Sequence, residues 1–361
     1  MENKCVNLGR CGGCTFIFPY FEQKLKKESY IRSLFSDLSF CNPIIVPKIL
    51  NYRNRMDFLA YQGLCLREKG KYDRFVNVDY CFITEELINS RIKFINELLK
   101  NYNDFYDLKT HQGTLRYVVI RTNGLNCQIN LVVYKNENYE TIANQLAKSF
   151  PEDSVYISLN DTFSDVSRGK YIKFLNREFI EMSYRDIIFK ITPNVFFQTN
   201  LKGFEVLCEI VENLISELKI KKIVDLFCGI GVFGIIAARK GMKVIGIDIE
   251  PENIKLAKIN AEINNIDIDF FCEDARKWSK RNSELYDLFI LDPPREGLSK
   301  EVINMLKISK PLHILYISCN PKTQKQNYNQ LSDLYDLIFC QPIDMFPFTN
   351  HLENVILLRL K

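Results

Sequence analysis

Residues 225–234 read Asp-Leu-Phe-Cys-Gly-Ile-Gly-Val-Phe-Gly, and this stretch decides the fold of the 361-residue chain. An apolar run at 222–227 predicts a strand immediately before the glycines, and a helix is predicted from about Phe233. The glycines fit the spacing G-x-G-x-x-G, which lets the backbone come close to a ligand at the N-terminus of a helix. The stretch therefore predicts a strand–turn–helix unit with a ligand at its turn.

Strands and helices are predicted to alternate on both sides of this unit. The pattern predicts helices at 201–218, 251–264 and 299–308, strands at 243–248, 268–272, 285–291 and 313–318, and final strands near 337–342 and 354–360. Alternation of this kind is typical of an α/β fold with a doubly wound parallel sheet. We expect the two final strands to form an antiparallel edge of that sheet.

The residues before 186 follow a different pattern, with short strands rich in Val, Ile, Tyr and Phe. Hairpins are predicted at 115–133, turning at Asn123-Gly124, and at 170–180, turning near Asn176; helices are predicted at 20–38, 91–102 and 139–150. We therefore expect three parts. They are a cysteine-rich segment with a helix (1–40), an α+β middle domain (41–185) and the doubly wound domain (186–361).

Three aspartates placed next to predicted strands indicate the kind of ligand. Asp248 lies 19 residues past Gly229, where its carboxylate can accept hydrogen bonds from ribose hydroxyls. Asp225 opens the glycine turn, where a carboxylate favours the ammonium of a methionine and disfavours a pyrophosphate. Asp274 follows another strand, where it can meet an adenine amino group. Asp225 and Asp274 favour S-adenosylmethionine over a nicotinamide cofactor, whereas the glycine spacing and Asp248 fit both.

Two loops after predicted strands, and the segment between the last two strands, carry reactive side chains. Asp292 is followed by two prolines, which stiffen the loop and fix the direction of the carboxylate. Cys319 follows a buried-looking strand, and an Asn-Pro pair then breaks that strand, so the thiol is expected at the cleft as a nucleophile. His351 and Glu353 supply an imidazole and a carboxylate that can transfer protons.

The cysteines near the N-terminus indicate a metal centre. Cys5, Cys11 and Cys14 follow the pattern C-x5-C-x2-C in a glycine-rich run, and Cys81 is a candidate for a fourth ligand. Glycines let the backbone wrap a site on which several thiolates converge. Zinc and an iron–sulfur cluster both suit four thiolates.

Composition favours a soluble protein, whereas the charge fits RNA binding and an ordinary solvated surface equally well. Hydrophobic residues make up 47% and charged residues 25% of the chain, which are ordinary values for globular proteins. Residues 1–180 carry 25 basic and 20 acidic side chains, a net charge of +5, and the remainder carries 23 and 24, a net charge of −1. We find no signal peptide and no apolar run of about 18 residues, so a reducing cytoplasm and free thiols are expected, with no membrane and no obligate protein partner.

Taken together, the chain resembles the S-adenosylmethionine-dependent RNA uracil-C5-methyltransferases, which form 5-methyluridine in transfer and ribosomal RNA. The resemblance extends over nearly the whole chain and implies a class I methyltransferase-like fold. It is carried by the cysteine loop, the motifs Tyr52-Arg-Asn-Arg55 and Phe196-Phe-Gln-Thr-Asn200, DLFCG, DPPR and SCNP, and the final DMFP…HLE segment.

The resemblance also implies roles for individual residues. S-adenosyl-L-methionine would contact Gln198, Phe227, Asp248 and Asp292, with Asp274 as a further candidate. Cys319 would be the nucleophile that adds to the uracil ring, and Glu353 would be the general base. A [4Fe-4S] cluster would be held by Cys5, Cys11, Cys14 and Cys81.

Two departures from the family pattern affect these expectations. Phe348 stands where the family often has His, and the stretch before Cys5 leaves no room for the small RNA-binding barrel that many members carry. RNA is therefore expected to dock on the middle domain, with Arg53 and Arg55 among its contacts. The alternatives are a nicotinamide-dependent oxidoreductase and a catalytically inactive RNA-binding protein. The sequence leaves open which RNA and which uridine would be modified.

Overall fold

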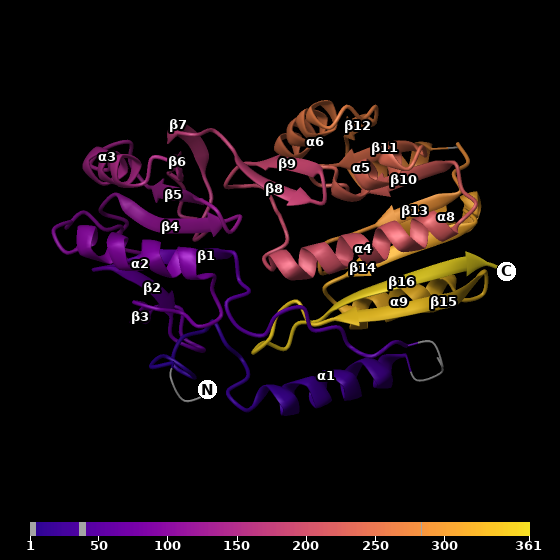
Figure 1. Cartoon of the computed structure of the whole chain (residues 1–361), viewed down its shortest axis with the longest axis horizontal. Helices are drawn as coiled ribbons and strands as arrows, with labels where there is room; N and C mark the ends of the chain where they lie inside the picture. The colour runs from indigo at the N-terminus through magenta and orange to yellow at the C-terminus, as the bar shows by residue number, and fades with distance from the viewer. Residues whose placement is uncertain (1–4, 36–40, 283) are drawn as a thin grey trace.

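The computed structural model describes residues 5–35, 41–282 and 284–361. Two seven-stranded sheets lie side by side, and a two-stranded sheet lies between them in sequence (Figure 1). The helix α1 (Tyr20–Leu34) runs along the C-terminal hairpin, although more than 300 residues of chain separate the two (Figure 1). The last residues of the helix expected at 20–38 lie outside the described residues.

The C-terminal sheet is the doubly wound sheet that the sequence predicts. Its strand order is β12-β11-β10-β13-β14-β16-β15. The strands are β10 (Lys222–Leu226), β11 (Lys243–Asp248), β12 (Asp269–Cys272), β13 (Leu288–Leu291), β14 (His313–Ser318), β15 (Tyr335–Ile343) and β16 (Glu353–Leu360). The first five pair in parallel, whereas β16 pairs antiparallel with both β14 and β15. Both the parallel sheet and its antiparallel edge are therefore confirmed.

The helix α4 (Leu201–Glu217) comes before the first strand of this sheet. The helices that connect its strands are α5 (Val232–Arg239), α6 (Pro251–Ile263), α7 (Ala275–Arg281), α8 (Lys300–Ser309) and α9 (Pro321–Leu331). The sequence pattern missed α7 and α9. Both begin at side-chain caps, since Asp274 accepts a hydrogen bond from the backbone N–H of Arg276 and Asn320 accepts one from that of Thr323. The α9 sequence is mostly polar, so capping and packing against the sheet determine it more than hydrophobic periodicity does.

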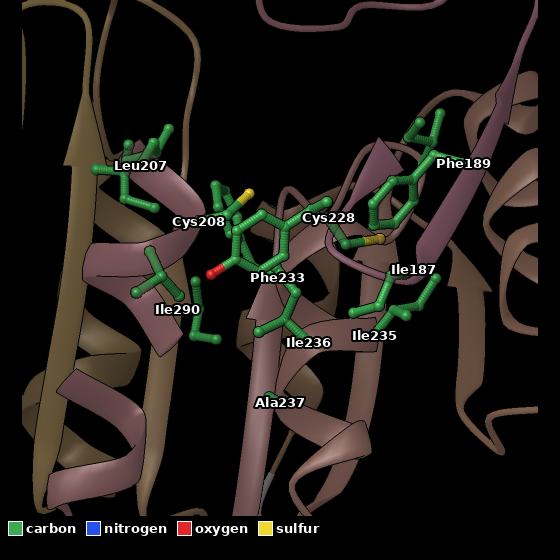
Figure 2. Packing of buried hydrophobic residues seen from close by; sticks show 14 of the residues in the cluster. Ile187, Phe189, Leu207, Cys208, Cys228, Phe233, Ile235, Ile236, Ala237 and Ile290 are labelled. Atoms are coloured by element: carbon green, nitrogen blue, oxygen red, sulfur yellow. The ribbon is translucent and has the colours of Figure 1, made fainter. Parts of the chain in front are cut away.

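The core of this part of the molecule is continuous from the glycine turn to the two-stranded sheet. Figure 2 shows Cys228 and Phe233, from the turn and α5, between Cys208 of α4 and Phe189 of β9. All four side chains are buried. The packing holds the glycine turn against α4, and so fixes where the backbone of the turn lies.

The middle sheet has the order β3-β2-β1-β4-β5-β6-β7 and is antiparallel except for the β5–β6 pair. Its elements are β1 (Arg55–Ala60), β2 (Leu64–Arg67), β3 (Phe75–Asn77), α2 (Glu86–Leu99), β4 (Leu115–Thr122), β5 (Cys127–Val133), α3 (Glu140–Ser149), β6 (Ser154–Leu159) and β7 (Lys170–Asn176). The predicted hairpin at 115–133 is confirmed by the pairing of β4 with β5. Short strands around two helices match the expected α+β pattern.

The predicted hairpin at 170–180 is wrong. The chain does turn at Asn176, which has a φ of +66°, but β7 pairs with β6 and not with the strand that follows it. That strand, β8 (Ile180–Tyr184), pairs with β9 (Ile187–Ile191) in a separate sheet. Ile180, Met182 and Tyr184 are buried in the same core as α4 and α5, and this burial determines the partner of β8.

The helix α1 with Phe35, and residues 41–45, pack on the C-terminal sheet. Ile31, Phe35 and Ile44 are buried among residues of β13, β14 and β15. None of the helices in the described ranges combines the length and the apolar character that a membrane crossing needs.

Candidate active site

The antiparallel edge strand brings the predicted nucleophile and the predicted base to the same end of the sheet. Cys319 directly follows β14, and Glu353 is the first residue of β16. Because the two strands run in opposite directions, the end of β14 meets the start of β16, and Ser318 pairs with Asn354. The sequence separation of 34 residues gives no sign of this proximity.

A cavity of about 770 Å³ opens at this end of the sheet. His351 lines a different cavity, whereas the seven residues to which the family resemblance assigns catalytic or cofactor roles all line this one: Gln198, Phe227, Asp248, Asp274, Asp292, Cys319 and Glu353. They come from the carboxyl ends of five parallel strands, β10 to β14, the start of β16 and the loop before α4. Ligands bind at this end of doubly wound sheets, where the loops of several strands converge.

The glycine turn has the backbone conformation that its sequence predicts. Gly229 and Gly231 have φ values of +54° and +87°, and Phe227 also lies in the left-handed region, at +71°. A non-glycine residue in this region is strained and is often found at functional sites. Asp248 Oδ2 accepts a hydrogen bond of 2.9 Å from the backbone N–H of Gly229, so this carboxylate fixes the start of the turn.

Asp225 does not line the cavity, in contrast to the expected contact with a methionine ammonium. Its side chain is fully buried, and its Oδ2 accepts a hydrogen bond of 2.8 Å from the backbone N–H of Gly234. Burial, with a smaller contribution from the charges of Asp292 and Asp248, raises the pKa of Asp225 to about 7. Asp225 therefore stabilises the glycine turn through its hydrogen bond with Gly234.

Two carboxyl groups and one thiol influence one another in the cavity. Burial raises the pKa of Asp292 to about 7, and burial together with the charge of Asp292 raises the pKa of Glu353 well above its ordinary value. Burial, then the charges of Glu353 and Asp292, raise the pKa of Cys319 to about 11, which the nearby Arg295 partly opposes. Carboxyl groups with raised pKa values at a cleft are suited to proton transfer near neutral pH.

Asp274 has a different environment from the other two aspartates of the cavity. It caps α7 and is paired with Arg276, whose guanidinium lowers the pKa of Asp274 to about 2. This carboxylate is therefore ionised at neutral pH. It can accept a hydrogen bond from an amino group but cannot act as a base near pH 7.

Gln198 offers a free acceptor to a ligand. Its Oε1 is buried and has no hydrogen-bond partner among the described residues. Its backbone carbonyl accepts a hydrogen bond from Asn54 Nδ2 at 3.3 Å, which joins the YRNR motif to the FFQTN motif. The neighbouring Asn200 caps α4 and donates to the carbonyl of Met345 at 3.0 Å. The two motifs therefore hold Gln198 and the C-terminal loop in fixed positions.

Arg295 is a site residue to which the sequence reasoning gave no role. It lines the cavity, and its guanidinium lies 2.8 Å from Nδ1 of His351. The Nδ2 group of Asn320 donates to its carbonyl at 3.1 Å. Its place directly after Asp-Pro-Pro is the signal that could have identified it, since the loop that positions Asp292 also positions Arg295.

A second cavity, of about 1,100 Å³, is lined by all four cysteines of the predicted metal centre. Burial, then the charges of Cys81, Cys11 and Cys5, raise the pKa of Cys14 to about 12. Within the described ranges, no group of three or more His, Cys, Asp or Glu side chains is arranged to hold a metal ion. The four thiols therefore line one cavity, but their side chains are not arranged as a complete set of metal ligands.

Of the two arginines expected to contact RNA, one has its donors engaged within the protein. Arg55 donates to Asp57 at 2.8 and 3.0 Å and to the carbonyl of Pro193 at 2.8 Å. Arg53 lines the cysteine cavity, and its Nε donates to the carbonyl of Arg55 at 3.0 Å.

Comparisons with known proteins identify the family. A family model described as tRNA (Uracil-5-)-methyltransferase matches residues 19–361. The tRNA (uracil(54)-C(5))-methyltransferase of Pyrococcus furiosus is 34% identical over 99% of this chain and 85% of its own length, and an uncharacterized RNA methyltransferase of Nanoarchaeum equitans is 35% identical over 98% and 79%. The crystal structure of the Pyrococcus abyssi tRNA (uracil-54, C5)-methyltransferase with S-adenosyl-L-homocysteine aligns with a TM-score of 0.83 at 30% identity, covering 96% of this chain and 85% of that one. This chain belongs to the tRNA (uracil-5-)-methyltransferase family.

Proposed function

We propose that this enzyme transfers a methyl group from S-adenosylmethionine to carbon five of a uridine in transfer RNA, through a covalent bond between Cys319 and the uracil ring. The observation that carries the proposal is the single cavity that joins the thiol of Cys319, the carboxyl groups of Asp292 and Glu353, and the glycine turn. A nicotinamide oxidoreductase would leave the thiol and Glu353 without a role.

The side chains of the cavity have the properties that this reaction needs. Carbon five of uracil is too weak a nucleophile to take a methyl group unaided. Addition of Cys319 Sγ to carbon six converts the ring to an enolate, and carbon five then takes up the methyl group. Glu353 accepts the proton left on carbon five, the bond between sulfur and carbon six breaks, and the thiolate of Cys319 is released.

The cavity fits S-adenosylmethionine, which supplies an electrophilic methyl group. Among the described residues that line it, seven are acidic and two are basic, a balance that suits a ligand with a sulfonium and an ammonium. Asp248 and the backbone of the glycine turn would hold the ribose end of the ligand, and the free Oε1 of Gln198 would accept a hydrogen bond from it. The charged Asp274 would meet the adenine amino group.

The printed names of the Pyrococcus relatives assign them uridine 54 of transfer RNA, and we propose the same target here. The base must leave its stack to enter a cavity at the end of the sheet, so base flipping is expected. Asn54, directly before strand β1 of the middle sheet, contacts the carbonyl of Gln198, a residue of the cavity, and this contact supports RNA docking on the middle domain. Ribosomal RNA is the alternative substrate.

Methyl transfer from tritiated S-adenosylmethionine tests the target. We expect label on an unmodified tRNA transcript and none on the same transcript with cytidine at position 54. Cys319→Ala should abolish labelling and also the covalent trapping of RNA that contains 5-fluorouridine. Labelling of ribosomal RNA alone would exclude the tRNA assignment, and trapping by the Cys319→Ala variant would place the nucleophile elsewhere.

The role of Glu353 is tested separately. Glu353→Gln keeps the shape of the side chain but cannot accept the proton from carbon five, so the methylated protein–RNA adduct should accumulate while turnover falls by about 10²–10⁴-fold. Denaturing gels of the enzyme with labelled RNA would show the adduct. Turnover at the wild-type rate would exclude Glu353 as the base.

We further propose that the four thiols of the second cavity hold a [4Fe-4S] cluster. The proposal is supported by the four thiols that line one cavity. It is also supported by the pKa of Cys14, which burial and then the charges of Cys81, Cys11 and Cys5 raise, since a bound cation would offset these charges. Closing the ligand set requires a movement of the loop that carries Cys5, Cys11 and Cys14. Methyl transfer involves no net electron change, so a structural role is expected.

Metal analysis tests this second proposal. Anaerobically purified protein should carry about four irons per chain and absorb visible light. Cys81→Ser should lose the iron, whereas Cys65→Ser, at a buried thiol of β2 outside this cavity, should retain it. Stoichiometric zinc in place of iron would refute the cluster.

A further inference from the structure

Two cysteines outside both cavities lie next to each other at the edge of the C-terminal sheet. Cys41 belongs to the segment of residues 41–45, and Cys340 belongs to the edge strand β15. The segment pairs with that strand in parallel, because the backbone N–H of Asn42 donates to the carbonyl of Cys340 at 3.0 Å and that of Ile45 donates to the carbonyl of Pro342 at 3.1 Å. Cys41 and Cys340 are bridge partners in this pairing.

The backbone geometry suits a disulfide. Residues paired across neighbouring strands have Cα atoms about 5 Å apart, within the range of about 4.4–6.8 Å that disulfides require. The Sγ atoms of Cys41 and Cys340 are 3.7 Å apart, with the S–H of Cys340 directed at the sulfur of Cys41. A disulfide bond is about 2.0 Å long, so small side-chain rotations are enough to form it.

The two thiols differ in access and in acidity. Cys41 is half-buried, whereas Cys340 is fully buried. The hydrogen bond from Cys340, with a smaller contribution from Arg32, lowers the pKa of Cys41 to about 7, while the same contact and burial raise the pKa of Cys340. The thiolate is the reactive form of cysteine, so the accessible member of the pair is also the nucleophilic one.

We propose that Cys41 and Cys340 are an oxidation site, in which peroxides react with Cys41 and Cys340 then resolves the product to a disulfide. The thiolate of Cys41 attacks one peroxide oxygen, the O–O bond breaks, and sulfenic acid and hydroxide form. The sulfur of Cys340 then displaces hydroxide from the sulfur of Cys41, and its own proton leaves with the hydroxide as water. Two thiols and one hydrogen peroxide thus yield one disulfide and two waters.

The disulfide would join the segment after α1 covalently to the edge strand. This segment leads from the cysteine-rich loop and α1 into the middle domain, so oxidation would fix the N-terminal part of the chain on the C-terminal sheet. Neither thiol lines the 770 Å³ cavity, so the inference is independent of the proposed reaction. Disulfides of this kind in a reducing compartment are transient and respond to redox state.

Peptide mapping of the intact protein tests the site. The reduced enzyme is treated with hydrogen peroxide, free thiols are alkylated, and digests are analysed by mass spectrometry. We expect loss of both free thiols and a linked peptide pair joining Cys41 to Cys340, which dithiothreitol separates. In Cys340→Ser the oxidised Cys41 should persist as a sulfenic acid that dimedone labels, and in Cys41→Ser the thiol of Cys340 should stay free.

Cys272 provides the reference, because it is an exposed thiol on β12. Cys272→Ser should leave the linkage unchanged. The proposal is refuted if Cys41 and Cys340 are both recovered as free thiols at peroxide doses that oxidise Cys272, or if Cys41 is found linked to another cysteine. Methyl transfer by reduced Cys41→Ser should equal that of the wild type, and its loss would not affect the outcome of the mapping.

Discussion

At the scale of single residues, the environment of Cys319 is the least expected feature of the site. Thiols that act as nucleophiles usually have a lowered pKa, whereas burial and the charges of Glu353 and Asp292 raise the pKa of Cys319, the proposed nucleophile, to about 11. In the resting enzyme the proton therefore stays on Cys319. A bound ligand with positive charge would offset the carboxylates, so cofactor binding should favour the thiolate. We therefore expect the thiol of Cys319 to become reactive only after the cofactor has bound.

Removing the neighbouring charges should make Cys319 more reactive in the free enzyme. A nearby anion raises the pKa of a thiol, so Glu353→Gln should shift the pKa of Cys319 down from about 11, and Asp292→Asn should shift it less, since Glu353 contributes the larger charge effect. Alkylation of Cys319 by iodoacetamide, followed by mass spectrometry as a function of pH, measures the shift. An alkylation midpoint at the same or a higher pH in Glu353→Gln would contradict this electrostatic account.

At the scale of elements, the turn between β10 and α5 depends on glycine for two separate reasons. Gly231 has a φ of +87°, and a Cβ placed there would lie 2.9 Å from Cζ of Phe270. Gly241 has the same φ of +87°, but a Cβ there would meet nothing within 4 Å. Comparing alanine substitutions at Gly231 and Gly241 therefore separates the destabilisation due to a left-handed backbone from that due to a steric clash.

Gly231→Ala should therefore destabilise the protein more than Gly241→Ala. Each substitution costs about 1–2 kcal/mol of stability for the left-handed conformation, and the clash with Phe270 costs about 1–3 kcal/mol more at Gly231. Gly231→Ala should also weaken S-adenosylmethionine binding, because the turn must shift. Unfolding experiments and calorimetric titration with the cofactor measure the two effects. Equal losses of stability in the two variants would show that the side chain of Phe270 moves aside without any loss of stability.

At the scale of the whole molecule, a buried ion pair joins the two ends of the chain. Lys27 of α1 lies 2.7 Å from Asp344 in the loop between β15 and β16, and the two side chains are 3% and 0% exposed. The hydroxyl of Tyr20 donates to the same carboxylate at 2.9 Å. Gln23 of the same helix accepts a hydrogen bond from the backbone N–H of Phe348 at 2.8 Å. The helix that follows the cysteine loop thus holds the loop that leads to Glu353.

Lys27→Met should cost about 3–5 kcal/mol of stability, because it leaves a buried carboxylate without its cation. Lys24→Met on the same helix should cost less than about 1 kcal/mol, since its contact with Glu28 is exposed to solvent. The double variant Lys27→Met/Asp344→Asn should recover part of the loss. Chemical unfolding of the four proteins measures these differences, and near-equal stabilities of the two single variants would rule out the proposed role of the pair.

The sequence by itself determined the doubly wound sheet, the hairpin at 115–133 and the glycine turn, because periodicity and glycine spacing are local properties that follow the chain. Through the motifs that carry the family resemblance, it also pointed to seven of the side chains that line one cavity. Tertiary structure alone decided that Cys319 and Glu353 meet, because the antiparallel direction of β16 cannot be read from their spacing. It also gave β8 its true partner, turned Asp225 away from the cavity and paired Cys41 with Cys340, because burial and long-range pairing depend on residues far away in the chain.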